Sequence, residues 1–134
     1  MRRAILGGAI ALIAGGALAV AVSAHTSRTQ SELSFNAQTS GVENNYVYGT
    51  LSSPIGRCEG GRRVGVYRKR PNADALLGAD RSLEGAGRYT VTAPTGDMTP
   101  GDYYSKVRAR DIAPGGRHAH ICKADRTPAH PVGP

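Results

Sequence analysis

Residues 62–107 read RRVGVYRKRPNADALLGADRSLEGAGRYTVTAPTGDMTPGDYYSKV, and this stretch decides the fold. Apolar residues alternate with polar ones in separate short segments, with Val64 and Val66 in the first and Tyr89 and Val91 in a later one. Turns rich in glycine and proline separate the segments. Such alternation is typical of half-buried β-strands, so the stretch predicts antiparallel strands with one face in a core and the other in water.

The composition indicates one small all-β domain. The chain has 134 residues, and about 110 remain once an export segment is set aside, which is enough for a single core. It contains 18 Gly and 8 Pro but one Phe and no Trp. This balance favours many short strands joined by turns over long helices. We therefore predict a β-sandwich.

The charge of the chain indicates its possible partners. The formal net charge is +7, and Arg2 and Arg3 supply two of these charges, so the chain without its export segment carries about +5. A basic surface attracts wall polymers, lipid headgroups or nucleic acid. Nucleic acid is not expected, because the sequence lacks basic residues interleaved with exposed aromatics and lacks a groove-reading helix. The expected partner is an envelope polymer or another extracellular protein.

Residues 1–24 are predicted to be a helical secretory signal peptide. Two arginines follow Met1, residues 4–22 are an uninterrupted uncharged run, and small residues lead up to Ala24. The predicted location is therefore secreted or extracytoplasmic, in the cell envelope. The alternative is an anchor kept in the membrane, because 19 uncharged residues can just span a bilayer. The chain contacts a membrane only if this segment stays uncleaved.

The two cysteines, Cys58 and Cys122, flank the strand-rich stretch. An exported chain reaches an oxidising compartment, where two cysteines pair more often than not. Closing a loop of about 65 residues stabilises a fold by roughly 4 kcal/mol in the chain-entropy treatment. We therefore predict a Cys58–Cys122 disulfide that closes the sandwich.

The remaining chain divides into three parts by pattern. A polar stretch without periodicity precedes the first clear strand, and prolines interrupt the C-terminal end. The predicted parts are a flexible N-terminal segment with an edge strand at 31–36 (25–44), the β-sandwich domain (45–126) and a proline-rich tail (127–134).

A histidine cluster near the C-terminus allows a metal site. His118, His120 and Cys122 would share one strand face, because they lie at alternate positions. Two imidazoles so spaced can hold zinc or copper, with His130 as a third ligand. Against this, the disulfide consumes Cys122, and no carboxylate is arranged to orient the rings. The other interpretation is two half-exposed histidines near the end of a strand.

The signal peptide places one more histidine at a possible chain end. Cleavage after Ala24 would leave His25 as the N-terminal residue, whose amine and ring together can chelate copper. Such a site also needs a second histidine close by, and cleavage after Ala21 would place His25 inside the chain instead. We therefore do not expect a copper site at His25 from the sequence.

The order of motifs resembles a known family. Cys58 is followed by RVGVYR at 63–68, GRYTV at 87–91 and PGDYYSKV at 100–107, and Cys122 ends the series. This order is similar to the transthyretin-like, or carboxypeptidase regulatory-like (prealbumin-like), β-sandwich module of secreted bacterial proteins. The resemblance implies a seven-stranded antiparallel Greek-key β-sandwich of the transthyretin/Ig-like type, used as an accessory or adhesion-type module.

The enzymes of that superfamily are not the expected relatives. The hydroxyisourate hydrolases carry a C-terminal Tyr-Arg-Gly-Ser signature, whereas this chain ends Pro131-Val132-Gly133-Pro134. Family members also usually continue into a last strand after the second cysteine, and here prolines interrupt it. The resemblance therefore does not imply hydrolase activity for this chain.

No catalytic set is recognisable in the sequence. The carboxylates lie scattered in predicted turns, and no histidine or serine motif joins them; they are Asp74, Asp80, Glu84, Asp97 and Asp102. No glycine-rich phosphate loop opens a helix. We therefore expect no enzyme and no cofactor, but an exported binding or structural module of the cell envelope or extracellular space. The alternative is a secreted metal-binding domain that uses His118 and His120 for zinc or copper.

Overall fold

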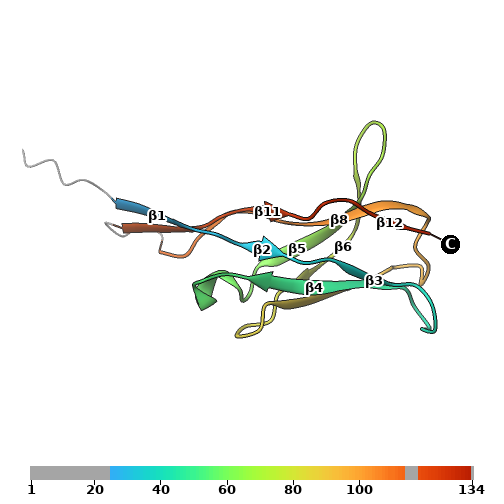
Figure 1. Ribbon diagram of the computed structural model, residues 1–134, viewed down its shortest axis with the longest axis horizontal. Helices are drawn as coiled ribbons and strands as arrows, with labels where there is room; N and C mark the ends of the chain where they lie inside the picture. The colour runs from blue at the N-terminus through green and yellow to red at the C-terminus, as the bar shows by residue number, and fades with distance from the viewer. Residues whose placement is uncertain (1–24, 114–117, 134) are drawn as a thin grey trace, which may run out of the picture.

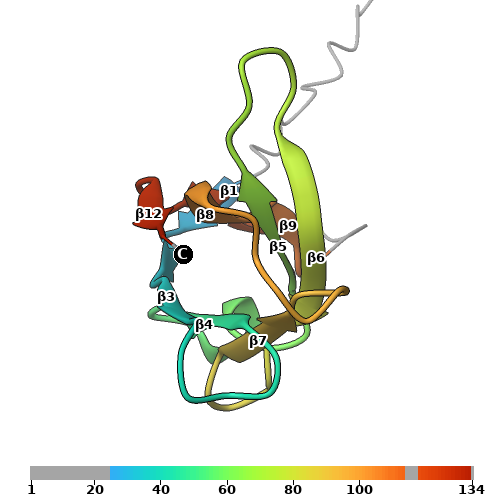
Figure 2. The same cartoon turned by 90° about the vertical axis from the view of Figure 1, so that its right-hand side faces the viewer.

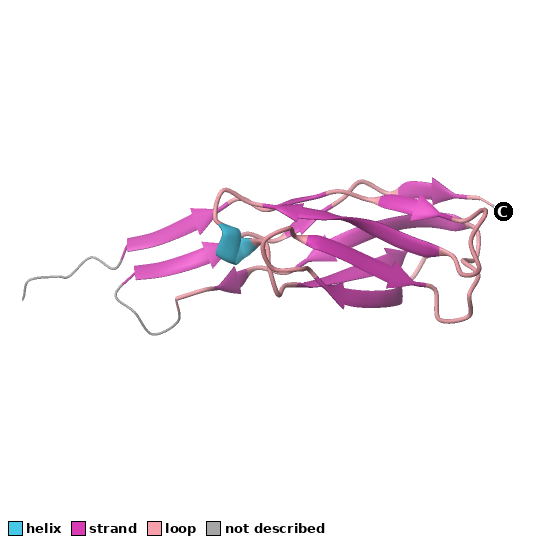
Figure 3. Ribbon diagram, turned by 90° about the horizontal axis from the view of Figure 1, so that it is seen from below, coloured by secondary structure: helices cyan, strands magenta, loops and turns pink. Residues whose placement is uncertain are grey.

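The computed structural model describes residues 25–113 and 118–133, which are all-β apart from one short 3-10 turn. The predicted signal peptide lies outside the described residues. The strands are β1 His25–Thr29, β2 Glu32–Leu33, β3 Asn36–Gln38, β4 Tyr46–Ser52, β5 Arg63–Arg68, β6 Ala75–Arg81, β7 Arg88–Thr92, β8 Gly101–Val107, β9 Arg110–Asp111, β10 His118–Cys122, β11 Asp125–Arg126 and β12 His130–Val132, and the turn is η1 Gly56–Cys58. Most strands run along the long axis of the molecule (Figures 1 and 3).

Two antiparallel sheets face each other across one interior (Figure 2). In the first sheet, β4 is central, with β7 on one side and the short strands β2 and β3 on the other. In the second, β8 and β5 are central, β6 is one edge, and β11 and β12 both pair with β8 at the other edge. The prediction of an all-β fold is confirmed.

The core lies between the two sheets and contains the residues that the alternation predicts. Val64 and Val66 of β5 are fully buried, and Tyr89 and Val91 of β7 are 2% and 3% exposed. Strands in both sheets contribute to one apolar cluster, which comprises Leu33, Val47, Leu51, Val64, Val66, Tyr89, Val91, Ala93, Met98, Tyr103, Val107 and Val132. Burial of these side chains is the main favourable term in forming the fold.

The N-terminal segment is more ordered than the sequence predicts. Residues 26–30 lack an apolar pattern, and we expect a flexible tether there, but β1 pairs in parallel with β10, and β10 pairs with β9. This three-stranded ribbon extends from one end of the sandwich (Figure 1). Thr26, Ser27 and Arg28 are exposed. Backbone pairing holds β1, and such pairing leaves no periodic signal in a strand that is mostly solvated.

The C-terminal tail also belongs to the sheet, contrary to the prediction that prolines exclude it. β12 pairs with β8, with Pro131 opposite Asp102, and Val132 is 6% exposed in the core. An edge strand tolerates proline, because the missing N–H can face away from the ladder. Among the described residues, no helix has the length and apolar content needed to cross a bilayer.

Candidate functional site

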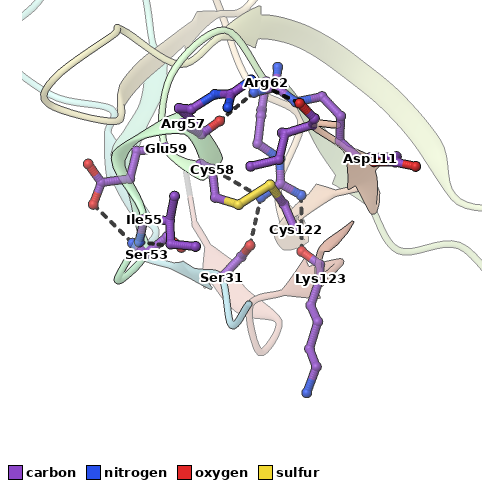
Figure 4. The surroundings of a disulfide bond; sticks show 12 residues. Ser31, Ser53, Ile55, Arg57, Cys58, Glu59, Arg62, Asp111, Cys122 and Lys123 are labelled. Atoms are coloured by element: carbon purple, nitrogen blue, oxygen red, sulfur yellow. Dashed lines mark hydrogen bonds between the residues drawn. A yellow bond between two sulfur atoms is a disulfide. The ribbon is translucent and has the colours of Figure 1, made fainter. Parts of the chain in front are cut away.

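The disulfide joins the ribbon to the sandwich. Cys58, at the end of η1, is bonded to Cys122, at the end of β10, with a Cα–Cα distance of 5.4 Å across 64 positions of sequence. Both residues are fully buried. The predicted bridge is present, and it fixes β10, and through β10 the whole ribbon, against the 3-10 turn (Figure 4).

A buried arginine organises the backbone around this bridge. Arg62 is 2% exposed. Its guanidinium donates to Ser31 Oγ (2.6 Å) and to the carbonyl oxygens of Cys58 (3.1 Å), Arg108 (2.6 Å) and Lys123 (3.0 Å) (Figure 4). Burial, and secondarily the nearby charge of Arg110, lowers the pKa of Arg62. These recorded bonds go to neutral acceptors, so they do not cancel the charge of Arg62.

Arg62 forms part of a strongly basic groove of about 340 Å³ on the outer side of the second sheet. The lining also includes Gly61, Gly65, Tyr67, Val107 and Ala109, and no carboxylate. The cationic lining residues are Arg62, Arg63, Arg81, Lys106, Arg108 and Arg110. We call this feature the basic groove. A surface hollow with one sign of charge concentrates ions of the opposite sign.

Strand register brings these cations together. Arg63 of β5 lies directly opposite Arg81 of β6. Lys106 of β8 lies opposite Gly65, and Arg108 follows Val107, the partner of Val64. Arg63, Arg81, Lys106 and Arg108 are all exposed. Like charges opposite each other destabilise a sheet, so this arrangement raises the free energy of the unliganded surface. A bound anion would relieve that repulsion.

Backbone carbonyls hold two of these arginines in place. Arg81 donates to the Gly61 carbonyl oxygen at 3.1 Å. Arg110 donates to the same oxygen at 3.3 Å, and to the carbonyls of Arg57 at 2.6 Å and Gly60 at 3.1 Å. Carbonyl contacts orient a guanidinium without neutralising it. The planar guanidinium then keeps its full charge for phosphate, sulfate or carboxylate, which it can bind through two parallel hydrogen bonds.

Tyr67 is the aromatic residue that lines the basic groove, and a stack of neighbouring side chains supports it. The Tyr67 ring covers Gly65, where an added Cβ would lie 2.7 Å from Tyr67 Cε2. Tyr67 stacks on Tyr104, with ring centroids 5.5 Å apart and planes 16° apart. The Arg126 guanidinium lies 3.7 Å from the Tyr104 ring centroid, and the Tyr104 hydroxyl donates to Asp74 Oδ2 at 2.6 Å. These contacts give that side of the groove a fixed shape.

The structure does not bring the three predicted metal ligands together. His118 and His120 both lie on β10 in the ribbon, and His120 is half-buried. His130 lies on β12, opposite Tyr103, at the far end of the molecule (Figure 1). Its ring stacks on Phe35 with centroids 4.8 Å apart. His130 as a third ligand is therefore wrong, because the chain runs extended from β10 to β12.

No group of three metal-ligating side chains lies close enough to hold an ion within the described residues, among which the side chains of His25 and His118 are not placed.

The sequence shows that Lys106 and Arg108 alternate away from the core. It does not show that Arg63 and Arg81 lie beside them, because that depends on pairing between strands. The basic groove is therefore the part of the candidate site that sequence reasoning missed.

Comparison of the chain with protein-family models, with curated proteins and with solved structures finds no match. The geometry of the basic groove therefore carries the functional conclusion.

Proposed function

We propose that this protein is an exported, non-enzymatic β-sandwich module that binds an anionic polymer of the cell envelope or extracellular space. The observation that carries the proposal is the basic groove, where six cationic side chains and no carboxylate surround one hollow of about 340 Å³. Guanidinium groups match the geometry of phosphate and sulfate oxygens better than that of neutral ligands. Repeated phosphate or sulfate groups are thus the chemistry that we expect the groove to recognise.

The spacing of the cations supports a polymer over a single small anion. Lys106, Arg108 and Arg110 recur at every second position of the chain. Lys106 lies on β8, Arg108 lies in the link that follows it, and Arg110 begins β9, so the three charges follow one another along the lining of the groove. Arg63 and Arg81 add a second row on the neighbouring strands. Two rows of charge suit a linear ligand that lies across the sheet.

Export is supported by two independent features. Arg2 and Arg3 precede a long uncharged run, as in secretory signals. Its buried disulfide is compatible with an oxidising, extracytoplasmic compartment. Mass spectrometry of protein from the culture medium and envelope tests this part, because we expect a mature chain that starts after Ala21 or Ala24. Recovery of only the reduced, full-length chain from the cytoplasm would contradict export.

We propose, as a finer description of the fold, a Greek-key sandwich of the Ig-like type with seven strand lines. A line is either one strand or two short strands that follow each other along the same edge. β2 and β3 both pair with β4, and β11 and β12 both pair with β8. Each of these two sets of short strands therefore counts as one interrupted edge strand. Three lines in one sheet and four in the other then make seven. The Tyr103 hydroxyl also donates to the Thr99 carbonyl oxygen at 2.6 Å, at the start of β8.

This contact has the form of a tyrosine corner. In Ig-like sandwiches, a tyrosine near the start of the sixth strand, here β8, donates a hydrogen bond to the backbone a few residues upstream. Kinship with the transthyretin-like family remains a prediction from the order of the sequence motifs. An experimental structure tests the proposed fold, in which the third, fourth, sixth and seventh lines share one sheet.

Titration with short-chain polyphosphate at two or more salt concentrations tests the proposed binding. The key variant replaces three exposed groove cations, Arg63→Gln/Arg81→Gln/Arg108→Gln. The matched control removes three exposed arginines elsewhere, Arg28→Gln/Arg70→Gln/Arg88→Gln. Both variants have the same net charge, so they separate a site from general attraction.

We expect the groove variant to weaken binding at least tenfold more than the control at low salt. We also expect its slope of log K against log salt to fall by about two, since each lost phosphate contact contributes roughly 0.7 to 0.9. Equal weakening by both variants would overturn the groove as the site. Turnover of any small substrate, abolished by the groove variant, would overturn the non-enzymatic assignment.

A further inference from the structure

The outer face of the first sheet carries a pair of tyrosines. Val47 of β4 is fully buried, so its neighbours Tyr46 and Tyr48 lie on the opposite, outer side of the strand. Tyr48 is 41% exposed, and Tyr46 is half-buried. Their ring centroids lie 5.8 Å apart, with the ring planes tilted by 48°. Aromatic pairs favour tilted contacts, so each ring helps to hold the other in place while part of the ring surface stays in water.

Strand register surrounds these tyrosines with uncharged polar side chains. β4 lies between β3 and β7 (Figure 2), and residues directly opposite each other in neighbouring strands share one face of the sheet. The residues on either side are two amides from β3 and two threonines from β7, three of them exposed. We call the six residues together the tyrosine face, which has the two rows Gln38, Tyr46, Thr92 and Asn36, Tyr48, Thr90.

The tyrosine face contains no acidic, basic or histidine residue, although the chain has a net charge of +7. The next row of the sheet pairs Thr50 with Arg88, so the first cation along β7 lies two positions beyond Thr90. Proteins bind nucleic acids and other polyanions largely through cations placed on the phosphates. The tyrosine face lacks such cations, so its ligand is an uncharged one.

The size of the tyrosine face limits the ligand further. Neighbouring strands are about 4.8 Å apart and alternate residues of a strand about 6.6 to 6.8 Å apart, so the six positions span roughly 7 by 10 Å. A stable protein interface uses about 20 to 30 residues from each partner, many more than this face offers. Extended peptides add to an open sheet edge, whereas β4 is paired on both sides. A ligand built of one or two small rings fits this area.

The side chains of the tyrosine face match the chemistry of a sugar. A pyranose ring presents C–H bonds on its faces and hydroxyl groups at its rim. The C–H hydrogens carry partial positive charge, so they are attracted to the electron-rich face of a tyrosine ring. Amide and hydroxyl side chains both donate and accept hydrogen bonds, as sugar hydroxyls do. Gln38 Nε2 donates to the Ser40 carbonyl oxygen at 2.7 Å, which orients its amide.

We propose that the tyrosine face binds a neutral saccharide, with Tyr48 as the principal stacking residue because it is the more exposed of the two rings. The proposal goes beyond the basic groove and does not depend on any anionic ligand. The basic groove lies on the outer side of the second sheet, and the tyrosine face lies on the outer side of the first. One chain can therefore hold an uncharged glycan and a polyanion at the same time.

Titration of the oxidised protein with chitohexaose, cellohexaose and maltohexaose, followed by the NMR signals of its backbone amides, tests the site. We expect at least one of these sugars to shift the signals of residues 46–48 and 90–92. Tyr48→Ala should weaken that binding at least tenfold, and Tyr48→Phe, which keeps the ring, less than threefold. Leu76→Ala is the matched control, since it removes an apolar side chain of β6 that is 49% exposed, and it should leave binding unchanged.

Salt and polyphosphate give a second readout that distinguishes this site from the basic groove. Binding of an uncharged sugar should be the same at low and high salt, and saturating short-chain polyphosphate should not displace it. Absence of binding by all three oligosaccharides would overturn the proposal, and so would displacement by polyphosphate or an equal loss in Tyr48→Ala and Leu76→Ala. Shifts of the same amides with protein concentration alone would assign the tyrosine face to a second copy of the chain instead.

Discussion

The Tyr89 hydroxyl donates a 2.6 Å hydrogen bond to the Ser34 carbonyl oxygen across the central strand of the first sheet. Tyr89 lies on β7, Ser34 lies between β2 and β3, and Gly49 of β4, the partner of Tyr89 in the ladder, lies between them. The same hydroxyl is 2.6 Å from Ser105 Oγ on β8 of the other sheet. One phenol oxygen thus joins three elements and both sheets.

Gly49 provides the space for this contact, and we expect Gly49→Ala to destabilise the protein strongly. An added Cβ would lie 2.2 Å from the Ser34 carbonyl oxygen and 2.8 Å from the Tyr89 hydroxyl. The backbone of the neighbouring segment would have to move, at a cost of roughly 1 to 3 kcal/mol or more. Urea unfolding measures the loss. Gly56→Ala is the control, because nothing lies within 4 Å of its added Cβ, and an equal loss there would contradict the explanation.

We expect Tyr89→Phe to cost about 1 to 3 kcal/mol, because it leaves the Ser34 carbonyl oxygen and the buried Ser105 hydroxyl without their shared partner. Burial also raises the pKa of Tyr89, so a folded chain keeps the phenol proton at a pH where an unfolded chain loses it. This contribution to stability is complete below about pH 10 and is lost as the pH rises through the folded pKa.

Unfolding free energies at pH 8 and pH 11 test the linkage. Wild type should lose more stability between these values than Tyr89→Phe, which lacks the titrating group. A larger alkaline loss in the variant would contradict the assignment.

Asp74 is expected to stabilise the β5–β6 hairpin only when it is ionised. The Tyr104 hydroxyl, and then the Arg70 backbone N–H, donate to its carboxylate and lower the pKa of Asp74. Because the pKa of Asp74 is lower in the folded chain than its unfolded pKa of about 3.9, the ionised carboxylate stabilises the fold at pH values above about 3.9. This stabilisation is lost as the pH falls through the folded pKa. Asp74→Asn should therefore be less stable than wild type at pH 7, and the two should converge near pH 2.

We expect Arg62→Met to cost at least about 3 kcal/mol. The change removes four hydrogen bonds and leaves the buried carbonyl of Cys58 and the partly buried carbonyls of Arg108 and Lys123 without that donor. Arg63→Gln, one position along and exposed, should change stability by no more than about 0.5 kcal/mol. Thermal unfolding of both variants compares them directly, and similar melting temperatures would show that the Arg62 contacts are not stabilising.

Replacing both cysteines, Cys58→Ser/Cys122→Ser, should remove about 4 kcal/mol of stability, since the bridge closes a loop of 64 positions. A domain of this size has a total stability of only about 5 to 15 kcal/mol. The variant should therefore unfold at much lower urea concentration. A matched melting temperature in oxidised and reduced wild type would contradict this expectation.

Local pattern predicted the strands that face the core. The alternation of Val64 with Val66, and of Tyr89 with Val91, needs only the two-residue period of a strand and burial on one side. β1 was missed, because its stability comes from pairing with residues some 93 positions later in the chain, His25 with His118. The basic groove was missed for the same reason, since Arg63 meets Arg81 only through the hairpin register.

The position of the bridge also determines how the molecule responds to pulling forces. Cys58 and Cys122 enclose β5 to β10 in one covalent ring, which contains every strand that lines the basic groove. A tension applied at the two ends of the chain can peel away the segments outside the ring, but it cannot extend the 64 positions inside it, about 220 Å of contour. A load on this protein would therefore not extend the strands that line the basic groove while the disulfide is intact.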